Sequence, residues 1–305
     1  MSALATGTDI MQSVRMLLAG SIDYAGLFPP AGLPMSDAVI NYATYRNSNY
    51  NWMLGRFIVM AARLDEFYEA AREFIPRDAE TAWRVSVVVG DDVVETMHQI
   101  KNFNVKKGPG VVCDAVEIKA ASHGAIDNAV ASLPANVTAY FEIAPDENMP
   151  ELVATLALKK QRAKLRTGGV TPDAFPTTQQ IIRFVRTCLA ANIPFKATAG
   201  LHHPIRCFKP LTYEANALTG TMHGFLNLFL MTGFAREGFK ISFLEDVMED
   251  EFGEVFRFED HAASWRDNYS LNLWQIENLR KFGIQSFGSC SFDEPVADLQ
   301  KLGIL

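Results

Sequence analysis

The sequence has few cysteines, no continuous long apolar run and no excess of basic residues. Its four cysteines stand far apart and form no C-x-x-C pair, a pattern that suits a reducing compartment better than a disulfide framework. The formal net charge of −7 argues against a general nucleic-acid-binding protein, because such proteins carry a basic face. We therefore expect a cytoplasmic protein without a nucleic-acid partner.

No segment has the composition of a membrane span or of a targeting signal. The most apolar stretch, LTGTMHGFLNLFLMTGFA, contains His223, Asn227 and three glycines, which favours a buried helix. The first twenty residues lack a basic start followed by a clean apolar block, so we expect no signal peptide. The apolar helix around GFLNLFLMTGF is a candidate interface for a homodimer.

Motifs for common cofactors are also missing. The chain has neither a G-x-G-x-x-G fingerprint nor a P-loop, so a nucleotide cofactor is not indicated. It has no H-x-H on its first strand and no H-E-x-x-H, which removes the usual signatures of zinc hydrolases. We predict no cofactor for the main interpretation.

What the sequence does contain is a regular alternation of strands and helices. Such an alternation indicates βαβ units and a parallel sheet. Eight units predict a single (β/α)8 barrel over residues 1–305, with a doubly wound open sheet as the alternative. The acidic segment 237–268 is interpreted as an insertion before the last strand, either a lid or an extra strand. The eight strand candidates are SIDYAGLF, GRFIVMAA, WRVSVVVG, VVCDAVEIKA, VTAYFEIA, AKLRTGG, PFKATAG and GIQSFGSCSF.

Charged side chains fall on one face of four consecutive predicted strands. Side chains alternate between the two faces of a strand, and the outer face of a barrel must be apolar because helices cover it. The charges are therefore expected inside the barrel, near the carboxyl ends of the strands, where barrel enzymes have their active sites. These residues are Glu117, Lys119, Glu142, Lys164, Arg166 and Lys196, with Asp23 from the first strand.

This set holds four cations and three carboxylates. A local excess of cations in an acidic protein predicts a small anionic substrate, a carboxylate or a phosphate. The alternative is a buried network of ion pairs, since isolated buried charges are costly. Glycines at strand ends let a ligand approach the backbone, or they serve only as tight turns. The predicted substrate-binding residues are Asp23, Glu117, Lys119, Lys164, Arg166, Gly168, Gly169, His203, Gly288 and Ser289.

Lys196 is the predicted nucleophile. Neighbouring cations and burial lower the pKa of a lysine, and a neutral lysine can form a Schiff base with a carbonyl substrate. A tight ion pair with Glu142 would instead keep Lys196 charged and make it an electrostatic or structural group. Glu142 or His202 is expected to move protons in this scheme.

Two resemblances bear on this region. KATAG resembles the K-T-S-T-G strand of deoxyribose-phosphate aldolase, a class I aldolase barrel. KLRTGG resembles that family's second lysine strand, which follows the first in the family but precedes KATAG in this chain. This resemblance implies imine chemistry at Lys196. The stretch from GGVTPDAFPT to KATAGLHHPIR also resembles a bacterial protein family to which no activity is assigned.

The adjacent pair His202 and His203 follows the lysine strand. Pro204 favours an extended conformation at His203, and neighbouring extended residues face opposite ways, so we expect only one histidine to reach the site. That histidine is a candidate general base or metal ligand, or a loop histidine bonded to the backbone. A site of Glu117, Glu142 and His202 would suit Mg or Mn.

The sequence thus predicts a metal-independent barrel enzyme, a carbon–carbon lyase or isomerase for a small anionic carbonyl or hydroxy compound. One alternative is a barrel isomerase or lyase that depends on a divalent metal. The other is a non-catalytic barrel that binds a ligand or an assembly partner.

Overall fold

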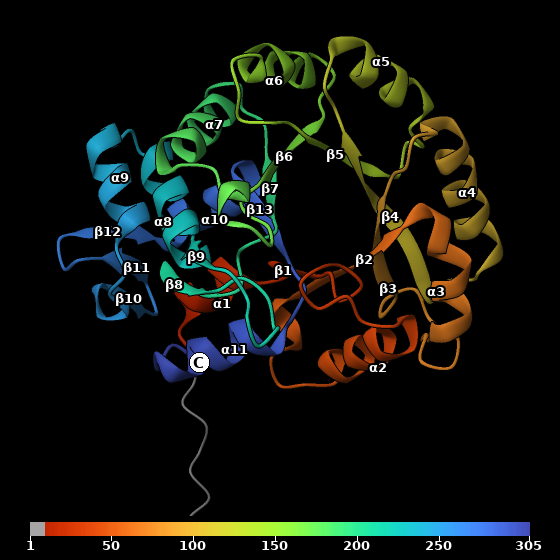
Figure 1. Ribbon diagram of the computed structural model, residues 1–305, viewed down its shortest axis with the longest axis horizontal. Coiled ribbons are helices and arrows are strands. Elements are labelled where there is room, and N and C mark those ends of the chain that lie inside the picture. Colours follow the sequence, from red (N-terminus) through yellow and green to blue (C-terminus); the bar gives the residue numbers. More distant parts are fainter. Residues whose placement is uncertain (1–9) are drawn as a thin grey trace, which may run out of the picture.

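The computed structural model describes residues 10–305. Eight parallel strands close into a barrel in the order β1-β13-β7-β6-β5-β4-β3-β2. Figure 1 shows this ring with helices around it. The predicted (β/α)8 barrel is confirmed, and each of its strands falls on a predicted one. The barrel strands are β1 (Ile22–Tyr24), β2 (Leu54–Met60), β3 (Trp83–Val88), β4 (Val111–Lys119), β5 (Thr138–Glu142), β6 (Arg162–Arg166), β7 (Phe195–Thr198) and β13 (Ile284–Ser289).

A helix follows every barrel strand, and α7 illustrates how such a helix forms. Thr177 caps its first turn, and Gln180 returns a bond to the Thr177 backbone, so a capping box satisfies two free N–H groups. The helices after the barrel strands are α2 (Met35–Arg46), α3 (Leu64–Ala71), α4 (Val93–Lys106), α5 (His123–Ser132), α6 (Met149–Leu158), α7 (Thr178–Ala190), α8 (Phe225–Arg236) and α11 (Asp293–Lys301). The remaining helical segments are α1 (Gln12–Leu18), α9 (Ile241–Glu249), α10 (Leu273–Phe282) and the short turns η1 (Asn51–Met53), η2 (Ala61–Arg63), η3 (Pro172–Ala174) and η4 (Gly253–Val255).

The main hydrophobic core lies between the strands and the helices. On β7, the outward residue Phe195 packs edge-on against Phe184 of α7, with ring centroids 5.6 Å apart. On β4 and β6, Val116 and Leu165 are fully buried. The alternate residues on these strands are the charged ones, so the predicted inward parity of the charges is confirmed.

The segment 237–268 lies beside the barrel and not over its mouth. It contains α9, η4, β10 (Phe256–Glu259) and β11 (Ala262–Trp265), and β12 (Tyr269–Asn272) completes a three-stranded antiparallel sheet. In Figure 1 these elements lie outside α8. The segment is therefore an insertion that contributes extra strands at the side of the barrel, and it does not form a lid.

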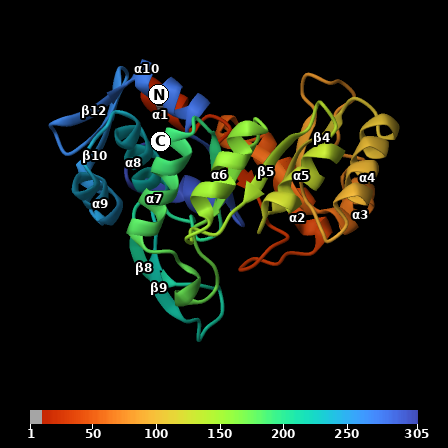
Figure 2. The ribbon, with the colours of Figure 1, turned by 90° about the horizontal axis from the view of Figure 1, so that it is seen from above.

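A second addition precedes α8. The sequence from about Tyr213 to Arg236 predicts one longer helical region, but the first part of that prediction is wrong. Residues 207–210 (β8) and 219–222 (β9) form an antiparallel hairpin that projects away from the ring in Figure 2. Pro210 and Gly220 lie within these strands, and both are poor helix residues.

Helix α8 is buried inside the chain, as its apolar composition predicted. Residues 225–234 are all buried, and the side chain of Asn227 is satisfied by the backbone of Arg206, Val247 and Asp250. The expectation that this helix forms a dimer interface is therefore wrong, because this chain covers it; a homodimer formed by another surface stays a prediction. Within residues 10–305, no helix is long and apolar enough to cross a membrane.

Candidate active site

A chain of alternating charges runs through the barrel interior. Lys196 Nζ lies 2.5 Å from Asp23 Oδ2 and 2.8 Å from Glu117 Oε1. Lys164 Nζ lies 2.7 Å from Glu117 Oε2 and 2.7 Å from Glu142 Oε2. The order is Asp23, Lys196, Glu117, Lys164, Glu142, and it leads from the depth of the barrel to its mouth. The predicted alternative of a buried ion-pair network thus holds for these five residues.

Strand register brings these side chains together. Lys164 pairs with Lys196 across β6 and β7, and Glu142 pairs with Lys164 across β5 and β6. Two lysines on adjacent strands would repel each other, but Glu117 offers one carboxylate oxygen to each. The two lysines can therefore both be buried.

Hydroxyl and backbone donors complete the deep end of the chain. Ser86 Oγ donates to Glu117 Oε1 over 2.9 Å, and Ser286 Oγ donates to Asp23 Oδ2 over 2.8 Å. The backbone N–H of Arg56 donates to Asp23 Oδ1 over 2.8 Å. Both buried carboxylates thus have neutral donors in addition to their lysines, which is the condition under which buried ion pairs are tolerated.

The prediction of a lowered pKa for Lys196 is wrong. Burial acts to lower the pKa of Lys196, but the carboxylates of Asp23 and Glu117 outweigh it and hold the pKa above its usual range. Burial likewise acts to raise the pKa of Glu117, but Lys164 and Lys196 outweigh it and hold the pKa well below its usual range. Lys196 is only 1% exposed. It is a charged group beneath the cavity described next, and its carboxylate partners are Asp23 and Glu117, not Glu142.

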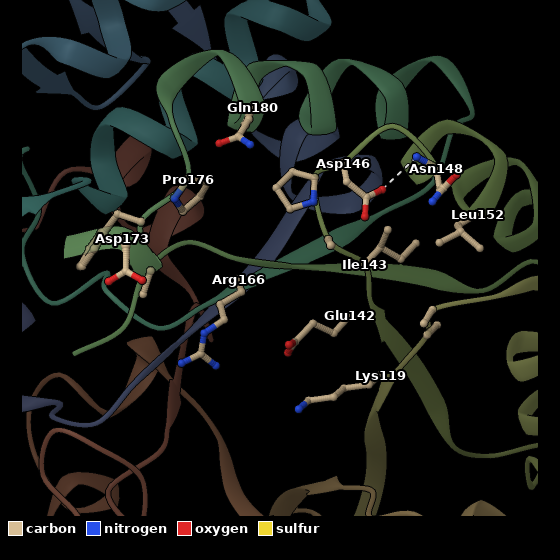
Figure 3. A pocket seen from close by; sticks show the side chains of 16 residues that line it. Lys119, Glu142, Ile143, Asp146, Asn148, Leu152, Arg166, Asp173, Pro176 and Gln180 are labelled. Carbon is tan, nitrogen blue, oxygen red and sulfur yellow. Dashed lines mark hydrogen bonds between the residues drawn. The ribbon is translucent and has the colours of Figure 1, made fainter. Parts of the chain in front are cut away.

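The upper end of the chain opens into a cavity of about 290 Å³ at the mouth of the barrel. Glu117, Glu142 and Arg166 line this one cavity, as the shared strand parity predicted, together with Lys164 and Lys119. A neighbouring cavity of about 490 Å³ shares Lys119, Glu142 and Arg166. Figure 3 shows the side chains of these three shared residues pointing toward a common space.

Lys119 and Arg166 are the exposed cations of this mouth. Both lie at the carboxyl ends of their strands. Within residues 10–305, no carboxylate lies within ion-pair distance of either one. They are therefore available to bind an anionic group, whereas Lys164 is already held between two carboxylates.

The other predicted residues divide between the cavity and its surroundings. Gly169 and Gly288 line the cavity, but Gly168 does not. A Cβ on Gly168 would lie 2.9 Å from the Cα of Gly200, so this glycine is required for close backbone packing. Ser289 is buried behind the cavity wall, where its carbonyl accepts a bond from the Ala25 N–H.

The two histidines separate, as expected from their opposite directions. His202 lines the mouth cavity and His203 does not. His203 Nδ1 lies 2.6 Å from Asp298 Oδ2. Burial lowers the pKa of His203 despite this contact. Only His202 is placed to act on a ligand in the cavity.

Sequence reasoning missed the surroundings of His202. Its Nδ1 lies 3.7 Å from Cys290 Sγ and 3.6 Å from Glu294 Oε2. Tyr213, from the turn of the β8–β9 hairpin, donates to Glu294 Oε2 over 2.8 Å and lies 3.6 Å from Cys290 Sγ. Cys290 directly follows β13, so its position at the end of a barrel strand was the one available signal.

The three donors proposed for a metal site line one cavity, but each already contacts other side chains. Both oxygens of Glu117 contact lysine ammonium groups, and Glu142 contacts Lys164. His202 faces Cys290 and Glu294 instead. In the part of the chain that the structure describes, no group of three or more His, Cys, Asp or Glu side chains is arranged to hold a metal ion.

The surroundings of His202 predict a pH-dependent contribution to stability. Burial acts to lower the pKa of His202, but Cys290 and Glu294 outweigh it and raise the pKa to about 9. Because the pKa is higher in the folded state, the protonated imidazole contributes its full stabilisation below pH ~6.5. This stabilisation is lost as the pH rises to about 9. We expect His202→Gln to lower the free energy of unfolding by about 1–3 kcal/mol more at pH 6 than at pH 9.5.

Urea unfolding of wild type and variant at these two pH values measures the difference. His98, which is exposed on α4, supplies the matched control His98→Gln, for which we expect no pH-dependent difference. An equal loss at both pH values for His202→Gln would contradict the proposed interaction with Cys290 and Glu294.

The mouth of the barrel therefore offers two exposed cations, the lysine–carboxylate pair that ends the buried charge chain, and a cysteine–histidine pair. Comparison with known proteins adds no family assignment: a scan of the chain against protein-family models gave no match, and neither did a search of curated protein sequences.

Proposed function

We propose that this protein is a metal-independent barrel enzyme, a carbon–carbon lyase or isomerase that acts on a small anionic carbonyl or hydroxy compound. One observation carries the proposal: the buried charge chain ends at Lys164 and Glu142 in a cavity whose exposed cations, Lys119 and Arg166, have no carboxylate partner among the described residues. A barrel serving only as a scaffold would fill its interior with branched apolar side chains.

The cavity suits a small anion. Its volume of about 290 Å³ lies at the lower end of the usual range for ligand pockets. Arg166 can bind a carboxylate or phosphate through two parallel hydrogen bonds, and Lys119 adds a second charge. We place the anionic group of the substrate between these two side chains.

Glu142 is the proposed base. Its side chain is 18% exposed, and only Oε2 contacts Lys164. Among the described residues, no hydrogen-bond partner occupies Oε1, so this oxygen can accept a proton from a substrate carbon or hydroxyl group. The Lys164 ammonium group lies beside it and can stabilise negative charge on the substrate oxygen. An isomerase returns the proton to another carbon, and a lyase uses the same charge stabilisation while a carbon–carbon bond breaks.

If a lysine forms an imine here, Lys164 is better placed than Lys196. Lys164 lines the cavity and Lys196 does not. In that case the resemblance to the aldolase family applies to β6 and β7 together, and the lysine that forms the covalent bond is the one on β6. The position of Lys164 between two carboxylates favours electrostatic catalysis by an ammonium group over imine formation.

Proton abstraction can be tested without knowing the full reaction. The protein is incubated in D2O with a panel of small keto acids and phosphorylated ketones, and exchange at the carbon next to the carbonyl is followed by NMR. We expect enzyme-dependent exchange for at least one anionic compound. Arg166→Met is expected to raise the concentration for half-maximal rate about tenfold or more, which corresponds to the ~1.5–3 kcal/mol of a hydrogen bond to a charged group.

Arg183→Met is the matched control, because Arg183 is exposed on α7 away from the cavity. Adding borohydride to the same mixtures, followed by peptide mass spectrometry, tests the imine route, and an adduct at Lys164 would establish it. Binding of the panel without exchange would support a ligand-binding barrel instead. Exchange that is lost with a chelator and restored by Mg or Mn would support the metal-dependent alternative.

A further inference from the structure

The strongest feature that the proposed function leaves unused is the cluster around Cys290. Cys290 and His202 both line the mouth cavity, whereas Tyr213 and Glu294 close the cluster from the side of the hairpin and α11. Cys290 is 5% exposed, so its sulfur is screened from bulk water while it borders the cavity. A cysteine beside a histidine in a partly open cavity is the arrangement that produces a reactive thiolate.

The hydrogen bonds define which groups can donate to the sulfur. The single hydroxyl proton of Tyr213 goes to Glu294 Oε2, so this hydroxyl has no proton left for Cys290. Among residues 10–305, the only other polar partner of Cys290 Sγ is Nδ1 of His202. A proton on Nδ1 lies within reach of both Sγ and Glu294 Oε2. Nδ1 of His202 is therefore the basic group placed to take the thiol proton of Cys290.

We propose that Cys290 and His202 form a nucleophilic thiolate–imidazolium pair that adds to the carbonyl carbon of a small anionic aldehyde in the mouth cavity. The thiol proton moves to His202 Nδ1, Sγ forms a bond to the carbonyl carbon, and the C=O π bond breaks. The carbonyl oxygen then takes the proton from His202, which gives a hemithioacetal with a neutral hydroxyl and an unchanged anionic group, and no leaving group or co-reactant is needed. The raised pKa of His202, about 9, agrees with a protonated imidazole at neutral pH.

The ligand class follows from the same cavity. Lys119 and Arg166 line it together with Cys290, so an anionic electrophile is attracted where a neutral one is not. This choice of an anionic carbonyl compound rests on the proposed function. The reactivity of the thiol does not, because it depends on His202, Glu294 and Tyr213 alone.

Alkylation rates test the thiolate directly. The protein is treated at pH 7 with iodoacetate or with iodoacetamide, and labelling at each cysteine is followed by peptide mass spectrometry. Cys207 is partly exposed and serves as the internal reference. Although Cys290 is the more buried of the two, we expect it to react at least tenfold faster, with a preference for iodoacetate relative to Cys207.

His202→Gln is expected to remove this advantage while leaving the Cys207 rate unchanged. Glu294→Gln should reduce it in part, and it provides a second variant if the first does not fold. Cys290 reacting no faster than Cys207, or an unchanged Cys290 rate in a folded His202→Gln protein, would overturn the proposal.

Addition to a carbonyl is tested with 13C-labelled glyoxylate as the probe. We expect a hemithioacetal carbon signal with wild type and no such signal with Cys290→Ser, and glyoxylate should slow the alkylation of Cys290. A reactive thiol without this signal would overturn the carbonyl-addition step. Rapid alkylation of Cys290 in a protein that shows no deuterium exchange would support the thiol site and reject the proposed function. Deuterium exchange in a protein whose Cys290 reacts slowly would support the proposed function and reject the thiol site.

Discussion

The Glu117→Gln variant is expected to lose about 3–5 kcal/mol of the free energy of unfolding. Glu117 is the carboxylate shared by Lys164 and Lys196, and all three side chains are nearly inaccessible to water. Glutamine fills the same volume but removes the negative charge. Each buried ammonium group would then keep one carboxylate partner, Asp23 for Lys196 and Glu142 for Lys164. The repulsion between the two lysines on adjacent strands would no longer be offset by a carboxylate that they share.

Urea unfolding at pH 7 measures this loss. Glu69→Gln is a suitable control, because Glu69 forms an exposed pair with Arg72 and such pairs contribute about 0–1 kcal/mol. Since the pKa of Glu117 lies below its usual range, its stabilisation is present above pH ~4.5 and is lost only as the pH falls through the depressed folded value. The difference between wild type and variant should therefore stay constant from pH 5 to about 8. A loss below 1 kcal/mol would show that the charge chain is not needed for the fold.

The second large effect is expected on catalysis. Glu142→Gln should reduce the rate of deuterium exchange about 10²–10⁴-fold, the usual contribution of a positioned general base. It should change the free energy of unfolding far less than Glu117→Gln does, because Glu142 contacts a single lysine and lies at the open end of the chain. This separation of activity from stability distinguishes a base from a structural carboxylate.

Glu147→Gln is the matched control, since Glu147 is exposed in the loop that follows β5. Both variants are compared with wild type in the NMR exchange assay and in urea unfolding. Exchange that survives in Glu142→Gln would transfer the role of base to another group at the mouth of the barrel.

The mouth of this barrel differs from one that binds phosphate after its last strands. Barrels often place a phosphate at the end of the last two strands, against a helix N-terminus. Here the first turn of α11 carries Asp293 and Glu294, so its positive dipole end already has carboxylates beside it. The exposed cations lie at the ends of β4 and β6 instead. An anion is therefore expected on that side, with the thiol of Cys290 on the other.

The sequence by itself determined the barrel and the inward direction of its charges. Eight strand candidates alternate with helices, and the outer face of each strand must be apolar to pack against helices. The parity of residues such as Lys164 and Lys196 therefore followed from their neighbours within a few positions. The long helix assigned from Tyr213 onward was partly wrong, because the pairing of residues 207–210 with 219–222 outweighs local apolar composition.

Only the tertiary structure decided which charges meet. Lys196 lies 173 positions from Asp23 and 79 from Glu117 in the chain, so no local pattern could show that carboxylates, and not cations, are its closest neighbours. That choice of partners reverses the sign of the expected pKa shift of Lys196 and transfers the cavity-facing role to Lys164. The contact between His202 and Cys290, 88 positions apart, arises for the same reason. Closing the barrel places the ends of β7 and β13 side by side, and sequence distance carries no information about that contact.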